Sequence, residues 1–153
     1  MTDINARLGE LGITLPKPAA PIANYLPFVR SGNLLFISGQ IALNSEGIVT
    51  GTLGRDMDVA SGQQAARLCA INLLAQASSA LDGDLNRVKR VIKLGGFIQT
   101  DANFTDIPNV MNGASDLMVE VFGDLGRHAR FAVGSSSLPM GSAVEIDGTF
   151  EVD

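Results

Sequence analysis

Two long helical patterns constrain the fold of this chain more than any other feature of its sequence. One runs from Asp58 to Leu81 and the other from Asp106 to Phe122, each with an apolar stripe at helical spacing. The stripes consist of Ala66, Cys69, Ala70, Leu73, Ala77, Ala80 and Leu81 in the first pattern and of Ile107, Val110, Met111, Ala114, Leu117, Met118, Val121 and Phe122 in the second. An aspartate begins each pattern as a candidate N-cap, and Gly83 and Gly123 end them.

Strand-like segments lie before, between and after the two helical patterns. Residues 25–30 and 34–38 predict a hairpin, residues 88–99 predict a long strand, and residues 131–137 and 144–152 predict a final hairpin. The last segment alternates strictly between apolar and polar side chains. Gly95-Gly96 interrupts the long strand and favours a bulge or a close backbone approach.

The resulting order, ββ-α-β-α-ββ, predicts an α+β fold with a mixed sheet and two long helices on one face. Two helices can cover only one face of such a sheet, so the other face must meet solvent or another subunit. We expect residues 1–153 to form a single domain. Within it, residues 1–22 supply a short helix over 2–12 and an irregular proline-rich connector.

Composition excludes several classes of function. The formal net charge is -5, whereas a nucleic-acid-binding surface needs clustered basic residues. No run of about 18 apolar residues suggests a membrane span, and the N-terminus does not look like a signal peptide. We therefore expect no nucleic-acid or membrane partner and a cytoplasmic location.

The cysteine and histidine content also limits which metal and catalytic sites the chain can form. Cys69 and His128 are the only residues of their types, and a zinc site needs three or four such ligands. We expect no metal, and we expect Cys69 to be a small buried hydrophobic side chain. His128 is not part of a nucleophile elbow, because Gly134-Ser135-Ser136-Ser137-Leu138 departs from that pattern; it is expected in a loop or at an interface.

Arg130 and Glu145 are the candidate chemical groups. An arginine at the start of a strand can offer a planar fork of donors to a carboxylate. Glu145 lies on the polar face of the last strand, where a carboxylate can position a water or accept a proton. The alternative for both is a solvated surface side chain, and the residues alone do not decide between these readings.

Four segments in order resemble the Rid family, which is also called YjgF or L-PSP endoribonuclease. They are Leu34-Leu35-Phe36-Ile37-Ser38-Gly39-Gln40-Ile41, Val88-Lys89-Arg90-Val91, Asp101-Ala102-Asn103-Phe104, and the closing set of Arg130, Val133, Leu138-Pro139 and Val144-Glu145-Ile146. The resemblance covers residues 24–152. It looks like a longer subgroup that has an N-terminal helix.

The resemblance implies a fold similar to that of chorismate mutase from bacilli and a homotrimer with a cleft at each subunit interface. It also implies cofactor-free hydrolysis of 2-imino or 2-enamino acids to 2-keto acids and ammonia. Arg130 then matches the residue that binds the substrate carboxylate, and Glu145 matches the one that helps place the attacking water. The matching pocket positions are Tyr25, Gly39, Asn112 and the backbone of Ala132.

The chain departs from the family pattern on both sides of Arg130. Ala129 replaces the usual proline, and Phe131 replaces a small hydroxyl residue and is expected to line the pocket. These changes leave open a second function, a trimeric protein that binds small carboxylates without turnover. A third, an endoribonuclease or translation inhibitor, fits poorly with the sequence pI of 4.7.

Overall fold

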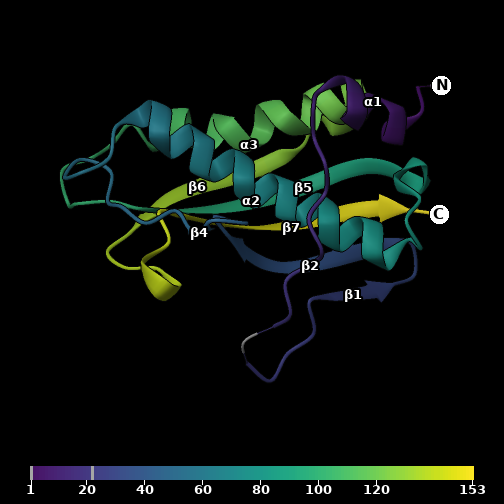
Figure 1. Ribbon diagram of the computed structural model, residues 1–153, viewed down its shortest axis with the longest axis horizontal. Coiled ribbons are helices and arrows are strands. Elements are labelled where there is room, and N and C mark those ends of the chain that lie inside the picture. Colours follow the sequence, from purple (N-terminus) through teal and green to yellow (C-terminus); the bar gives the residue numbers. More distant parts are fainter. Residues whose placement is uncertain (1, 22) are drawn as a thin grey trace.

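Within residues 2–21 and 23–153, which the computed structural model describes, five strands form one mixed sheet in the order β1-β2-β7-β5-β6 (Figure 1). Met1 and Ile22, the two ends of the expected N-terminal segment, lie outside the described residues. The strands are β1 (Phe28–Ser31), β2 (Leu34–Ile41), β5 (Val88–Gln99), β6 (Ala129–Ser135) and β7 (Val144–Val152). A separate small hairpin joins β3 (Leu43–Asn44) to β4 (Gly47–Ile48).

The predicted final hairpin is wrong. β7 lies in the middle of the sheet, antiparallel to both β2 and β5, whereas β6 pairs parallel to β5. Helix α3 (Ile107–Phe122) provides the crossover between those two parallel strands. Among the described residues β6 pairs with β5 alone, so it forms one edge of the sheet.

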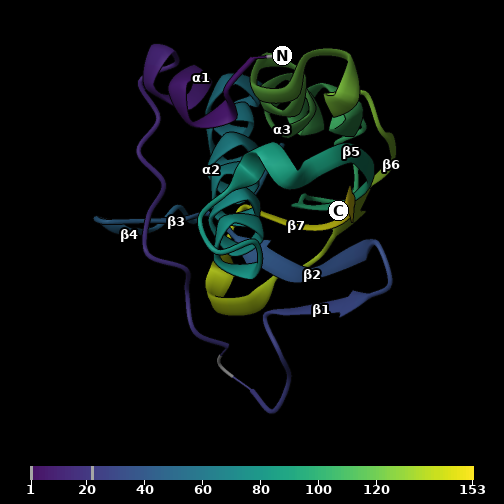
Figure 2. The same cartoon turned by 90° about the vertical axis from the view of Figure 1, so that its right-hand side faces the viewer.

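Helices α2 (Val59–Ala80) and α3 cover one face of the sheet, as predicted (Figure 2). The Asp58 carboxylate caps α2 by accepting from the Ser61 N–H at 2.8 Å. Asp106 precedes α3 but makes no capping hydrogen bond through its side chain, and Pro108 occupies the first turn instead. The two helices pack closely at Gly113, where a Cβ would overlap the Gln63 carbonyl of α2.

The core between the helices and the sheet is aliphatic. Val144, Ile146, Phe150 and Val152 of β7 point into it, which confirms the predicted alternation of the last strand. Cys69 is fully buried, as expected, and burial raises the pKa of its thiol well above the ordinary value. Gly95 and Gly96 carry no bulge; they are points of close approach, to Asp147 and Phe131 on one side and to Met111 on the other.

The N-terminal segment packs along the helices. Helix α1 (Ile4–Glu10) buries Leu8, and Arg7 Nε donates to the Glu120 carbonyl of α3 at 2.8 Å. Farther on, Gln76 Nε2 of α2 donates to the Ala19 carbonyl at 2.9 Å. This contact places the connector over the end of the sheet where β2 stops. Tyr25, predicted to begin a strand, lies before β1.

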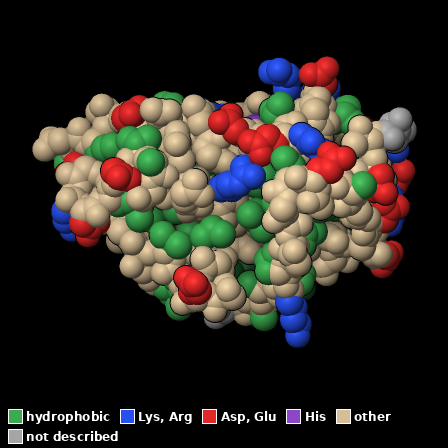
Figure 3. Space-filling model, turned by 45° about the horizontal axis from the view of Figure 1, so that its top comes forward, with side chains coloured by type: hydrophobic (Ala, Val, Ile, Leu, Met, Phe, Trp, Pro, Cys, Tyr) green, Lys and Arg blue, Asp and Glu red, His purple; other side chains and the backbone are tan. Residues whose placement is uncertain are grey.

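The face of the sheet opposite the helices carries exposed apolar side chains from several strands. Phe36 of β2 is 44% exposed, Phe97 of β5 is 40% exposed, and Phe131 and Val133 of β6 are 37% and 43% exposed. We call these four residues the free-face patch. On the side drawn in Figure 3, acidic and basic side chains are interspersed and surround clusters of apolar side chains.

Three short 3-10 helices complete the described chain, at Leu85–Arg87, Gly123–Gly126 and Pro139–Gly141. The last two lie beside the candidate site residues.

None of the helices among residues 2–21 and 23–153 has the length and apolar character needed to cross a membrane.

Candidate functional site

Arg130 is the second residue of β6, and its side chain extends toward helix α3. Its Nη1 donates to Asn112 Oδ1 at 2.9 Å and to Ser115 Oγ at 3.0 Å. Its Nη2 donates to the Pro108 carbonyl at 3.2 Å. The structure therefore brings Arg130 and Asn112 together, two of the residues that the sequence singled out.

These contacts leave one edge of the guanidinium available. The group has five N–H donors, and three of them are used by Asn112, Ser115 and Pro108. Among the described residues, the Nε–H and the second Nη2–H have no partner. Nε and Nη2 share one edge of the planar group, and such an edge binds both oxygens of a carboxylate. Arg130 is thus a cation held by three hydrogen bonds, and its Nε–H and one Nη2–H remain without a partner among the described residues.

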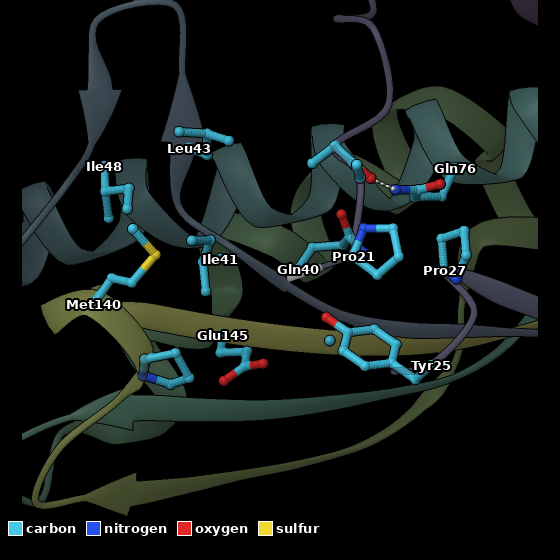
Figure 4. A pocket seen from close by; sticks show the side chains of 14 residues that line it. Pro21, Tyr25, Pro27, Gln40, Ile41, Leu43, Ile48, Gln76, Met140 and Glu145 are labelled. Atoms are coloured by element: carbon cyan, nitrogen blue, oxygen red, sulfur yellow. Dashed lines mark hydrogen bonds between the residues drawn. The ribbon is translucent and has the colours of Figure 1, made fainter. Parts of the chain in front are cut away.

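Glu145 of β7 lines a cavity of about 240 Å³ at the end of the sheet (Figure 4). The cavity is bounded by the connector, the ends of β2 and β7, helix α2 and the last 3-10 helix. Its described lining is mostly apolar, with Glu145 as its one acidic side chain: Ala19, Ala20, Pro21, Tyr25, Pro27, Gly39, Gln40, Ile41, Leu43, Ile48, Gln76, Pro139, Met140 and Glu145. Of the residues singled out in the sequence, the structure brings Tyr25, Gly39 and Glu145 together at this cavity.

The surroundings of Glu145 favour its protonated form. Burial raises the pKa of its carboxyl above the ordinary value, and the nearby charge of Asp147 raises it further. A carboxylate with a raised pKa is a better proton acceptor at neutral pH than an exposed one. Glu145 is therefore suited to take a proton from a water and return it.

Gly39 is required by the position of Glu145. The register between β2 and β7 shifts between Ile37 and Gln40, and Gly39 lies within this irregularity. A Cβ on Gly39 would lie 2.5 Å from Glu145 Oε1 and 3.1 Å from its Cδ. The absence of a side chain at Gly39 is what leaves room for the carboxylate at the cavity wall.

Arg130 and Glu145 lie on opposite sides of the sheet. Residues paired directly in a ladder point to the same face. Arg130 pairs with Leu94, which is fully buried under the helices, whereas Glu145 pairs with Phe97, which is exposed on the other face. One chain therefore holds two half-sites, Arg130 with Asn112 and Glu145 with Gly39 and Tyr25, and does not join them.

Phe131 and Ala132 follow Arg130 on β6 but belong to neither half-site. The Phe131 ring packs edge-on against Phe97, with centroids 5.4 Å apart, and the Lys93 ammonium lies 5.7 Å from its centroid. Ala132 packs against the core on the helix side. Because Phe131 points away from α3, it does not cover the Arg130 guanidinium of its own chain.

Two site residues were missed in the sequence, Ser115 and His128. Ser115 Oγ lies 2.9 Å from His128 Nε2, and His128 Nδ1 lies 2.6 Å from the Gly126 carbonyl. Burial lowers the pKa of His128 and the charge of Arg130 lowers it further, against a raising effect of the Gly126 hydrogen bond. Ser115 could have been found from its spacing, because it follows Asn112 by three residues on one helix face.

Metal-ligating side chains are scattered. Across residues 2–21 and 23–153, no three or more His, Cys, Asp or Glu side chains gather into a group that could hold an ion.

Comparison with known proteins identifies relatives over almost the whole chain. Residues 5–148 match the family described as YjgF/chorismate mutase-like. Protein TCP17 of Trypanosoma cruzi is 49% identical over 98% of this chain and 94% of its own length. The 2-iminobutanoate/2-iminopropanoate deaminase of Dermatophagoides farinae is 32% identical over 92% of this chain and 95% of its own.

A solved structure agrees with the observed fold. The protein Atu1372 of Agrobacterium tumefaciens, described as having unknown function, superposes with a TM-score of 0.92 at 54% identity, over 98% of this chain and 92% of that one. The α+β fold predicted from the sequence is therefore confirmed. The matched range, the relatives and the structure agree that the chain belongs to the YjgF/chorismate mutase-like family, which is the family that the four sequence segments resemble.

Proposed function

We propose that this chain is the subunit of a homotrimeric enzyme that hydrolyses reactive 2-imino and 2-enamino acids to 2-keto acids and ammonia without a cofactor. The observation that carries the proposal is that Arg130 is held by α3 while its Nε–H and one Nη2–H have no partner among the described residues, which leaves donors for a small carboxylate. The relative named as a 2-iminobutanoate/2-iminopropanoate deaminase supports the same substrate class.

The chemistry needs one cation, one base and one water. Arg130 binds the substrate carboxylate and holds the adjacent C2 in place. The imine carbon is electrophilic, so a water adds to C2 while Glu145 accepts its proton. Glu145 returns that proton to nitrogen to give a carbinolamine. The proton of the new hydroxyl then also moves to nitrogen, the carbonyl forms, the C–N bond breaks, and ammonia leaves with its electron pair. One imine and one water thus give one 2-keto acid and one ammonia; an enamine first gains a proton at C3 and loses one from nitrogen.

The site is completed between subunits. Because Arg130 and Glu145 lie on opposite sides of one sheet, a single chain cannot place both on one substrate. We infer that Arg130 of one subunit reaches the Glu145 cavity of its neighbour. The free-face patch supports this arrangement, because exposed apolar side chains of this kind are typical of association surfaces.

The test is release of 2-keto acid from imines that an amino-acid oxidase generates in situ. We expect the wild type to accelerate release well above buffer, and Arg130→Ala to lower kcat/KM by about 100-fold through loss of a two-donor ion pair. Arg127→Ala is the matched control, since Arg127 is exposed in the same segment and pairs with Asp124 at 3.3 Å. If the wild type releases 2-keto acid no faster than buffer does, the proposed enzymatic function is refuted.

The alternative function, binding of small carboxylates without turnover, is tested by a thermal-stability measurement beside this assay. Thermal stabilisation of the wild type by a 2-keto acid, without turnover of any imine, would favour a carboxylate-binding protein. The cytoplasmic location expected from the sequence stays a prediction, which fractionation of cells would check.

A further inference from the structure

A continuous chain of hydrogen bonds runs from the guanidinium of Arg130 to the backbone of the turn after α3. Arg130 Nη1 lies 3.0 Å from Ser115 Oγ, which lies 2.9 Å from His128 Nε2. His128 Nδ1 in turn lies 2.6 Å from the Gly126 carbonyl oxygen. This series of hydrogen bonds therefore links β6, α3 and the 3-10 helix Gly123–Gly126.

The chemistry of these groups fixes the direction of every bond. A carbonyl oxygen only accepts, so His128 Nδ1 carries a proton. In the neutral imidazole, Nε2 then accepts, and the Ser115 hydroxyl donates to it. A guanidinium only donates, so Ser115 Oγ accepts from Arg130. All donors point from Arg130 toward Gly126, and bonds aligned in this way strengthen one another.

Both ends of this hydrogen-bond chain are held in place by the fold. Gly126 is buried, and a Cβ there would overlap the Met118 carbonyl, so the turn lies directly on the backbone of α3. At the other end, Asn112 accepts the second Nη1 proton of Arg130 at 2.9 Å, one helical turn before Ser115. Nη1 is thus held from two positions of one helix.

We propose that Ser115 and His128 are positioning residues that hold the Arg130 guanidinium so that its Nε–Nη2 edge faces the substrate. This inference rests on the proposed function, in which that edge binds the substrate carboxylate. Neither Ser115 nor His128 touches substrate; both act through Arg130. Without them, the guanidinium can rotate and must lose that freedom again on binding.

The arrangement depends on a neutral His128. An imidazolium donates from both nitrogens, so Ser115 can no longer donate to Nε2, and two cations then share one hydroxyl. Burial lowers the pKa of His128 and Arg130 lowers it further, although the Gly126 bond opposes them. The hydrogen bonds should therefore keep their donor direction at neutral pH and lose it as the pH falls through the lowered pKa of His128.

Other charged groups near His128 are engaged or exposed. Arg90 of β5 donates to the Arg127 carbonyl at 3.1 Å, and Asp124 of the turn pairs with Arg127. Asp116 of α3, next to Ser115, is exposed. Arg130 of β6 is the charged group that acts on the pKa of His128.

The first experiment measures the Kd of a stable 2-keto acid between pH 5 and 8 for the wild type and three variants. We expect Ser115→Ala to raise Kd about tenfold at neutral pH, and Ser115→Thr, which keeps the hydroxyl, to restore most of the affinity. His128→Gln keeps an uncharged acceptor and should remove the part of the pH dependence that His128 causes. Ser79→Ala, at an exposed serine of α2, should match the wild type.

A second measurement separates this inference from the proposed function. The Arg130 Nε–H signal of the wild type, followed by NMR with labelled arginine, should shift as His128 titrates and should stop shifting in Ser115→Ala. Unchanged signals, or equal Kd values for wild type, Ser115→Ala and His128→Gln at every pH, would overturn the positioning role. If the Arg130 Nε–H signal shifts with pH as expected but the protein turns over no imine, the positioning role stands and only the proposed enzymatic function is overturned.

Discussion

The α-carbon of Gly39 lies so close to the Glu145 carboxylate that a methyl group on it would come within 2.5 Å of Oε1. Gly39→Ala should therefore displace that carboxylate from the cavity wall. We expect kcat to fall at least tenfold and the free energy of unfolding to drop by about 1–3 kcal/mol, the usual cost of overpacking. Stopped assays and urea titration would measure the two effects.

The cause of this loss can be checked with a double-mutant cycle. In a Glu145→Ala background the added methyl group has space, so Gly39→Ala should cost little further stability. An equal loss in both backgrounds would mean that the backbone, and not the carboxylate, is the source of strain.

The activity should fall at acid pH as Glu145 becomes protonated. Its pKa is raised by burial and by the charge of Asp147, and only the ionised form can accept a proton from water. Asp147→Asn removes the like charge and should lower the pKa, which moves the acid limb of the kcat profile to lower pH. Glu46→Gln, in an exposed turn, should leave the limb in place.

The same raised pKa affects stability with a definite sign. Between the ordinary pKa of a glutamate and the raised value, the folded chain binds more protons than the unfolded chain. The free energy of unfolding should therefore decrease as pH rises through that window. In Glu145→Gln this contribution disappears, so the difference in unfolding free energy between the wild type and the variant should shift against the wild type as pH rises through the window, which chemical unfolding at several pH values would measure.

Mixing two inactive variants should restore activity. Arg130→Ala lacks the cation and Glu145→Gln lacks the base, so each should be inactive alone. If each site combines one residue from each of two subunits, trimers reassembled from an equal mixture should recover about one quarter of the wild-type rate. Recovery near zero in trimers shown to be mixed would mean that the two residues act in the same chain or not at all.

A charge in the free-face patch should prevent assembly. Phe131 is 37% exposed and packs edge-on against Phe97, so Phe131→Asp would place a carboxylate in the proposed interface. We expect light scattering to give a monomer with a wild-type circular dichroism spectrum and no activity. Leu125→Asp, at a similarly exposed position in the turn after α3, is the control and should stay trimeric.

The helix pair should be sensitive to one methyl group. At Gly113 a Cβ would overlap the Gln63 carbonyl, and backbone cannot move aside as a side chain can. Gly113→Ala should lower the free energy of unfolding by about 2–3 kcal/mol. Gly9→Ala, where nothing lies within 4 Å, should instead raise it by about 0.5–1 kcal/mol through helix propensity; chemical denaturation would compare them.

Local patterns predicted the elements of this fold, but not their neighbours. The alternation in residues 144–152 and the stripes of α2 and α3 report burial along one element, and all three were correct. Strand pairing depends on packing between distant segments, so β7 was expected beside β6 and lies instead between β2 and β5. The chain gives no local sign of that insertion.

The candidate site was predictable as a set of residues and not as an arrangement. The resemblance selected Arg130, Glu145, Gly39, Tyr25, Asn112 and the backbone of Ala132; the structure groups the first five in two places and leaves Ala132 outside both. That Arg130 and Glu145 face opposite ways follows from the register of β5 with both its neighbours, which no single segment encodes. The spacing of Ser115 to Asn112 was readable on one helix face, but the contacts of Ser115 with Arg130 and His128 join segments far apart in the sequence, which no local pattern encodes.

Tyr25, described above as one wall of the Glu145 cavity, is the only tyrosine of a chain without tryptophan. Excitation at wavelengths that phenylalanine does not absorb therefore gives emission from Tyr25 alone, at the cavity. Occupation of the cavity can be followed by intrinsic fluorescence in unlabelled wild-type protein, before any substrate has been identified.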